Sequence, residues 1–150
     1  MSETPIHISE VIQAEKRLLT RLNSLFCQLT PSYKKMTAAA FEEIIAAKRT
    51  RLYVARDPEA RNKIIGTLTL VIYRIPTGLN ARIEDVVVDE SKRGLGIGRQ
   101  LMLHGIAEAE KAGASNVNLT SSPFRVAANK LYQVLGFEQR ETNVYRLKLK

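Results

Sequence analysis

A short basic segment with glycine at every second position is the part of the sequence best suited to chemistry. Gly94, Gly96 and Gly98 lie between Arg93 and Arg99. Glycines let a backbone approach a ligand closely and adopt conformations that other residues avoid. Where such a loop opens into a helix, the free N–H groups and the positive end of the helix dipole favour an anion. The two arginines add permanent positive charge, so the segment predicts a binding site for a pyrophosphate.

The order of residues in this loop narrows the choice of phosphate ligand. A loop that binds nucleoside triphosphates requires Gly-Lys-Ser/Thr at its end, but Gly98 is followed by Arg99 and Gln100. A dinucleotide-binding fingerprint requires a third glycine at position 99, which is arginine here. On the loop alone, a glycine-rich strand-to-helix turn without any ligand remains an alternative.

Two motifs together resemble one enzyme family. The loop has the pattern Arg93-x-x-Gly96-x-Gly98, and a later stretch carries an Asn, a Leu-Tyr pair and a Gly-Phe pair. The residues of that second stretch are Asn129, Leu131, Tyr132, Gly136 and Phe137. Both motifs, in this order and with a predicted strand between them, resemble the GCN5-related N-acetyltransferases (the GNAT family). The resemblance extends over residues 64–149, and the first sixty residues match only in general layout.

The resemblance implies transfer of an acetyl group from acetyl-CoA to a primary amine by direct attack in a ternary complex. It also implies that main-chain groups near Val86 and Val88 pair with the pantetheine amides, although the same valines can pack in a core. The implied cofactor-binding residues are Val86, Val88, Arg93, Gly94, Gly96, Gly98, Arg99 and Asn129. A non-catalytic module that binds or senses CoA would carry the same motifs.

Candidate proton donors and acceptors stand beside these motifs. Tyr132 matches the family's tyrosine, and a phenol with a pKa of about 10 can protonate a thiolate of about 8 to 9; packing in the core is its alternative role. Glu84 and Asp85 are adjacent carboxylates in an apolar strand, an expensive place for charge without a partner or a role. Glu84 is the favoured base, with a salt bridge to Arg82 as the alternative. Alternation places the two carboxylates on opposite sides of the strand, and a bulge could reverse them.

Four residues are candidate contacts for the acceptor amine. The family often builds its acceptor pocket from the segment between the first two helices, so Tyr33 is a candidate contact, with an ordinary loop tyrosine as the alternative. Asp85 is a second candidate. Arg140 and Tyr145, near the end of the chain, could line the acceptor site or brace a last strand.

Hydrophobic periodicity predicts the elements that position these residues. Strands are expected over residues 5–9, 51–56, 63–74, 81–88, 116–121 and 142–150, and helices over 10–29, 37–48, 96–113 and within 125–137. With the resemblance, this order predicts an α/β fold of the GNAT acyl-CoA N-acyltransferase type. Its mixed, mostly antiparallel sheet of six or seven strands would splay between the fourth and fifth strands and be flanked by four helices.

Length and composition fit one enzyme domain. At 150 residues the chain is expected to form a single domain over 1–150. Its 45% hydrophobic and 25% charged residues are ordinary for a globular protein. Without a membrane-span or signal-peptide pattern, the expected location is cytoplasmic and no membrane partner is expected.

The net charge of +8 requires a partner or a reason. An anionic CoA ligand accounts for part of it through long-range attraction. Nucleic acid is the less favoured alternative, because the basic residues are scattered and form no Lys/Arg tract. One cysteine and two histidines argue against an intrachain disulfide and a metal site. A homodimer remains open.

Overall fold

Five strands form one mixed sheet in the order β1-β2-β3-β4-β5 in the computed structural model, which describes residues 4–150. The strands are β1 (His7–Glu10), β2 (Thr50–Asp57), β3 (Lys63–Ile75), β4 (Gly78–Val88) and β5 (Asn116–Asn118). The first four pair antiparallel, and β5 joins β4 in parallel. The described chain divides into two units at Thr120, and the sheet lies in the first. The mixed α/β fold class is therefore confirmed.

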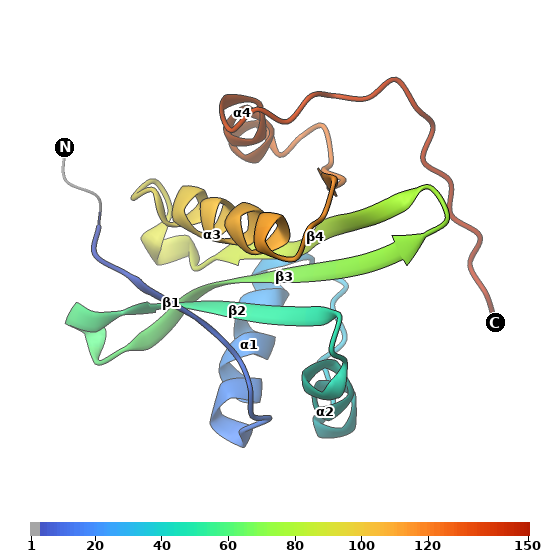
Figure 1. Ribbon diagram of the computed structural model, residues 1–150. Coiled ribbons are helices and arrows are strands. Elements are labelled where there is room, and N and C mark those ends of the chain that lie inside the picture. The colour runs from blue at the N-terminus through green and yellow to red at the C-terminus, as the bar shows by residue number, and fades with distance from the viewer. Residues whose placement is uncertain (1–3) are drawn as a thin grey trace. The chain divides into compact units, whose positions relative to one another are not determined.

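Three helices cover the two faces of this sheet (Figure 1). Helices α1 (Lys16–Leu29) and α2 (Ala38–Ala46) lie on one face, and α3 (Ile97–Lys111) lies on the other. Helix α1 begins later than the predicted residue 10, because the Val11 amide still donates to the Leu52 carbonyl of β2 at 2.7 Å. Thr37 caps α2 as predicted, accepting from the Ala40 amide at 3.1 Å. Within residues 4–150, no helix is both long and apolar enough to cross a membrane.

Helix α3 packs closely on β3 and β4, and this contact sets where its first turn lies. Its buried side chains include Leu101, Met102 and Ala109. A Cβ at Gly66 of β3 would lie 3.0 Å from Leu101 Cδ1 and 3.2 Å from the Val87 carbonyl oxygen. A side chain at this position would force Leu101 or the backbone of β4 to shift by a few tenths of an ångström. The loop that precedes α3 is therefore held against the end of β4.

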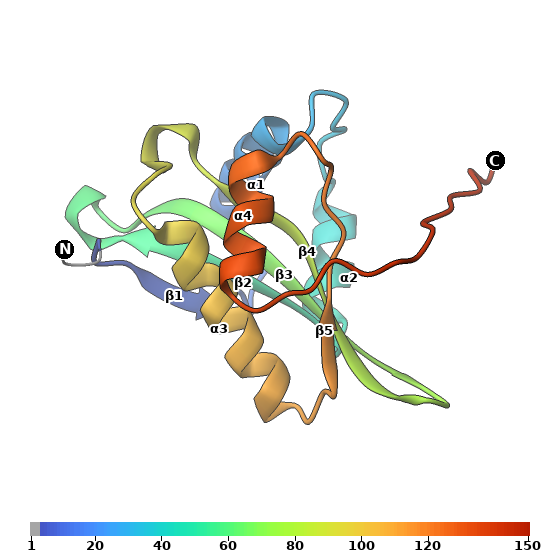
Figure 2. The ribbon, with the colours of Figure 1, turned by 90° about the horizontal axis from the view of Figure 1, so that it is seen from above.

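Strands β4 and β5 pair over three residues only. The paired positions are Asn80 with Asn116, Ala81 with Val117 and Arg82 with Asn118. Among the described residues, β4 from position 83 onward pairs with β3 alone, and Figure 2 shows how short β5 is beside it. The predicted divergence of the fourth and fifth strands is present. It leaves the second half of β4 as a sheet edge.

The second unit, Ser121–Lys150, contains helix α4 (Val126–Val134) and no strand. The prediction of a strand over 142–150 is wrong, and residues 4–150 contain five strands rather than the predicted six or seven. The alternation that suggested it is real, but Val144, Tyr145, Leu147 and Leu149 are 74 to 87% exposed. A strand needs a partner for its backbone groups as well as a suitable pattern. The four predicted helices are present.

Candidate active site

The segment after β4 turns into α3 through the predicted glycine loop. Gly94 and Gly96 have φ angles of 80° and 81°, in the left-handed region that favours glycine. A Cβ built on either would meet no atom within 4 Å, so there is open space beside the loop backbone. Gly96 is the N-cap of α3 and has no side chain to cap the first amides. The loop can therefore present main-chain N–H groups to an anion.

Arginines flank this turn on both sides. Arg93 and Arg99 are exposed, and Arg99 lies in the first turn of α3. Arg93 Nε donates to the Val88 carbonyl oxygen at 3.1 Å. The Val88 carbonyl, which is expected to pair with a pantetheine amide, thus already accepts a hydrogen bond from Arg93. A ligand amide would have to displace Arg93.

Asp89 anchors the start of the loop. Its Oδ1 accepts from the Ser91 amide at 3.0 Å and the Ser91 hydroxyl at 2.8 Å, and its Oδ2 pairs with Arg21 of α1. Burial acts to raise the pKa of Asp89, but the hydrogen bonds from Arg21 and Ser91 outweigh it and lower the pKa to about 2. The carboxylate is therefore charged at neutral pH. It ties the loop to α1.

A second ion pair holds the 3₁₀ turn Glu90–Lys92. Lys92 Nζ lies 3.0 Å from Oδ2 of Asp57, a residue only 5% exposed. The hydrogen bond from Lys92 lowers the pKa of Asp57. The Glu90 amide also donates to Gln28 Oε1 of α1 at 2.9 Å. Helix α1 and the end of strand β2 thus hold the backbone just before the glycines.

Sequence reasoning missed these positioning residues: Arg21, Gln28, Asp57, Asp89 and Lys92. The spacing Asp89-x-Ser91 is a local turn signal that could have been found, since Asp side chains often accept from the amide two residues on. Arg21 pairs with Asp89, and Lys92 pairs with Asp57. The two members of each pair are far apart in the sequence, so no local pattern reveals these pairs.

The two adjacent carboxylates of β4 lie at a bulge. The register of β3 and β4 shifts between Thr67 and Thr69, opposite this part of β4. Asp85 is exposed with φ 50°, an uncommon conformation for a residue other than glycine. Glu84 pairs through Oε1 with Arg82, the alternative left open by the sequence. Because of the bulge, the side chains of Glu84 and Asp85 need not point to opposite faces of the strand.

Tyr33 braces the connection between α1 and α2. Its hydroxyl donates to Asn23 Oδ1 at 2.5 Å and accepts from the Met36 amide at 3.0 Å. Its ring lies 5.6 Å from that of Phe26. Burial raises its pKa; the Met36 amide opposes this, and nearby Cys27 and Asp85 reinforce it. The phenol is therefore neutral and already hydrogen-bonded at physiological pH.

The second unit carries the remaining predicted residues. Tyr132 lies on α4, where burial raises its pKa and Arg125 opposes the rise. Asn129, one turn earlier, donates through Nδ2 to the Ser122 carbonyl at 2.9 Å. Arg140 and Tyr145 are exposed in the segment without a strand.

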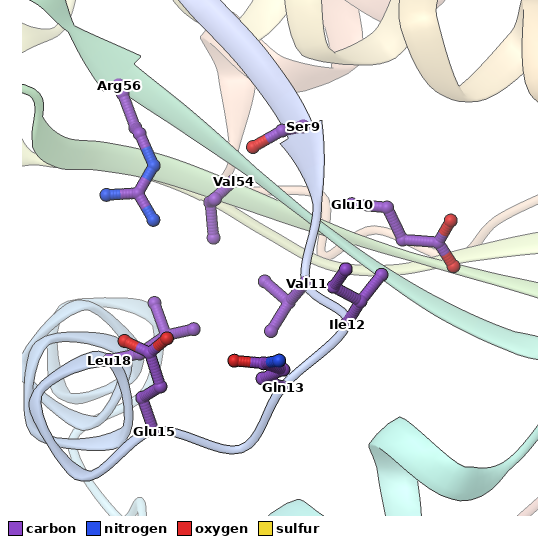
Figure 3. Close-up of a pocket in the computed structure, with 9 residues that line it drawn as sticks. All are labelled: Ser9, Glu10, Val11, Ile12, Gln13, Glu15, Leu18, Val54 and Arg56. Atoms are coloured by element: carbon purple, nitrogen blue, oxygen red, sulfur yellow. The ribbon is translucent and has the colours of Figure 1, made fainter.

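The first unit brings most predicted donor-binding residues to one junction, where β4 ends and α3 begins. These residues are Val86, Val88, Arg93, Gly94, Gly96, Gly98 and Arg99, with Glu84 and Asp85 just before them. A separate cavity of about 250 Å³, lined by the β1–α1 connection and β2, contains none of the predicted residues (Figure 3).

A diverging pair of strands beside a glycine-rich loop at a helix N-terminus is the arrangement expected of an acyl-CoA-dependent acyltransferase. A sequence profile of the acetyltransferase (GNAT) family matches residues 19–137. The chain belongs to this family.

Individual relatives agree with this assignment. Serotonin N-acetyltransferase 2, chloroplastic, of Oryza sativa subsp. japonica is 43% identical over 58 residues, which are 39% of this chain and 28% of that protein. A solved structure from Agrobacterium tumefaciens C58, named as an acetyltransferase, has a TM-score of 0.83 at 28% identity, covering 95% of this chain and 99% of that one. AAC(6')-Iy in complex with the bisubstrate analogue CoA-S-monomethyl-acetylneamine has a TM-score of 0.78 at 24% identity and covers 97% and 99%, a likeness of fold.

Proposed function

We propose that this chain transfers the acetyl group of acetyl-CoA to a primary amine of a small molecule by direct attack in a ternary complex. The observation that carries the proposal is the open turn at Gly94 and Gly96, which ion pairs of the buried carboxylates Asp89 and Asp57 hold at the start of α3. Family membership supplies the donor class. The names of relatives, serotonin and aminoglycoside N-acetyltransferases, support an amine as acceptor.

The loop fits the diphosphate of coenzyme A. Open space beside Gly94 and Gly96 lets oxygens approach the backbone, and Arg93 and Arg99 add the charge that phosphate requires. Main-chain groups of Val86 and Val88 would pair with the pantetheine amides, which requires Arg93 to release the Val88 carbonyl. Asn129 would hold the cofactor or a water molecule.

Glu84 and Tyr132 divide the proton transfers. Glu84 takes a proton from the ammonium, directly or through water, using the carboxylate oxygen that does not face Arg82. The free amine attacks the thioester carbonyl carbon, the C–N bond forms as the C–S bond breaks, and the nitrogen then loses its second proton to solvent. Tyr132 gives its proton to the leaving thiolate and regains one from solvent. Its raised pKa keeps the phenol protonated at neutral pH until that moment.

The acceptor side is assigned by the character of its residues. Asp85 provides a negative charge on an exposed bulge, suited to a cationic amine. Tyr33, Arg140 and Tyr145 are the further candidates, and the hydrogen bonds of Tyr33 favour a bracing role for it.

Calorimetry and a thiol-release assay test the proposal together. Acetyl-CoA should bind, and a panel of amines should release free thiol. Tyr132→Phe should lose most turnover with little change in CoA affinity, whereas Tyr73→Phe, a half-exposed tyrosine of β3, should keep both. Binding without thiol release from any amine would identify a CoA-binding module instead. Absence of binding at millimolar acetyl-CoA would reject the function.

A further inference from the structure

A second basic feature lies away from the glycine loop. A cavity of about 310 Å³ opens where the α2–β2 connection, the β3–β4 hairpin and the end of α3 meet. Lys48, Arg49, Arg51 and Arg74 line it, and we call it the basic end cavity. Four of its seven lining residues are therefore cationic.

Within the described residues, most of this charge has no carboxylate partner. Arg51 Nη1 lies 3.8 Å from Glu108 Oε2, and that carboxylate also binds Lys111 at 3.1 Å. No carboxylate oxygen within residues 4–150 lies within 4.0 Å of Lys48, Arg49 or Arg74. Like charges gathered around one hollow repel each other, and a bound anion would relieve that repulsion.

Apolar residues line the cavity beside the cations, and part of its backbone is hydrogen-bonded to the sheet. Ile72, which is 6% exposed, lies with Leu79 and Ala112 among its lining residues. The Ile72 amide donates to the Arg49 carbonyl at 2.8 Å, so the backbone that carries this arginine is tied to β3. The site therefore combines apolar and cationic lining residues, and the backbone of Arg49 is held in place.

The size and chemistry of the cavity select a small phosphorylated ligand. A volume of about 310 Å³ holds about ten water-sized atoms, enough for a phosphate and a short body. Guanidinium groups match phosphate oxygens in bidentate fashion. We propose that the basic end cavity binds the phosphate or diphosphate group of a small molecule, separately from the donor loop.

The two anion sites lie at opposite ends of α3. The glycine loop precedes Ile97, whereas Ala112 of the cavity directly follows the helix. Fifteen residues at 1.5 Å each place these ends about 22 Å apart. The cavity is therefore separate from the glycine loop that would bind the diphosphate of coenzyme A. Its test does not depend on the proposed acetyl transfer.

The test is a titration of ¹⁵N-labelled full-length protein with sodium pyrophosphate at constant ionic strength of about 0.15 M. Amides of Arg49, Thr50 and Leu79 report the basic end cavity, and those of Gly94 to Gly98 report the loop independently. We expect saturable shifts in the first group. The double variant Arg49→Gln/Arg74→Gln should weaken them at least about tenfold, because it removes two charge-assisted donors.

The matched control is Lys16→Gln/Arg17→Gln, which removes the same charge from exposed positions of α1. It should leave the cavity affinity within about twofold of wild type, since exposed charges at a distance are screened. An amide spectrum with native dispersion shows that each variant is folded. Equal weakening in both double variants would overturn the proposal, as would unsaturable or absent shifts at the cavity. Shifts there with single-stranded DNA but not with pyrophosphate would also overturn it, because they would indicate a nucleic-acid surface.

Discussion

Replacing Asp89 by asparagine tests how the glycine loop is positioned. The Asp89 side chain is only 9% exposed, and each of its oxygens has its own partner. Asparagine is nearly isosteric and keeps an oxygen that can accept from the Ser91 amide and hydroxyl. Its amide group would face the Arg21 guanidinium, so a donor would meet a donor. The effect should therefore be electrostatic rather than steric.

The magnitude follows from the pKa of Asp89. The pKa falls from the ordinary 3.8 to about 2 in the folded protein, and each unit corresponds to about 1.4 kcal/mol, giving about 2 kcal/mol. Because the folded-state pKa is depressed, this stability is present above about pH 4 and is lost as the pH falls toward 2. Asp89→Asn lacks it at every pH. The gap between wild type and variant should therefore shrink on acidification.

Urea unfolding at a series of pH values from 7 down to 3 measures this gap. We expect about 2 kcal/mol at pH 7 and a clearly smaller difference at pH 3. Glu42→Gln, an exposed change on α2, is the control and should stay within about 0.5 kcal/mol of wild type. A gap that does not change with pH, or no gap at pH 7, would refute the reasoning. In the thiol-release assay, Asp89→Asn should raise KM for acetyl-CoA more than it lowers kcat.

Three further substitutions separate packing, loop geometry and bracing. Gly66→Ala places a Cβ 3.0 Å from Leu101 Cδ1 and should cost about 1–3 kcal/mol of unfolding free energy in urea; an unchanged midpoint would contradict the close packing of α3. Gly96→Ala forces φ 81° on a residue with a side chain, which costs about 1–2 kcal/mol. It should raise KM for acetyl-CoA, and an unaltered KM would show that the loop does not hold the donor. Tyr33→Phe removes the bond to Asn23 and should cost about 1 kcal/mol in thermal or urea unfolding without changing the acceptor KM. A raised acceptor KM at unchanged stability would make Tyr33 a substrate contact.

The central hairpins could be predicted from sequence because their signals are local. Alternating β-branched residues set β3, and Asp57-Pro58 sets the turn before it, where Asp57 accepts from the Glu59 amide at 2.9 Å. Residues 142–150 alternate just as clearly and form no strand. The difference lies in pairing, because the pattern states which side chains share a face but not whether another strand is available. The predicted start of α1 is wrong for a similar reason. The helix begins late because the Val11 amide donates to the Leu52 carbonyl, which is distant in sequence.

The residues of the candidate site likewise include some that a local sequence pattern reveals and others that it does not. A loop that offers backbone to a ligand needs residues without side chains in a tight run, so Gly94 and Gly96 are visible in the sequence. Residues that position such a loop must be buried and must find their partners on other elements. Asp89 meets Arg21 across 68 positions of the chain, and no local pattern encodes that meeting. A buried carboxylate is nevertheless costly without a partner, so an aspartate at the end of an apolar strand implies that a cation must come from elsewhere. The sequence therefore indicates that Asp89 has a cationic partner, but the fold is needed to identify that partner as Arg21.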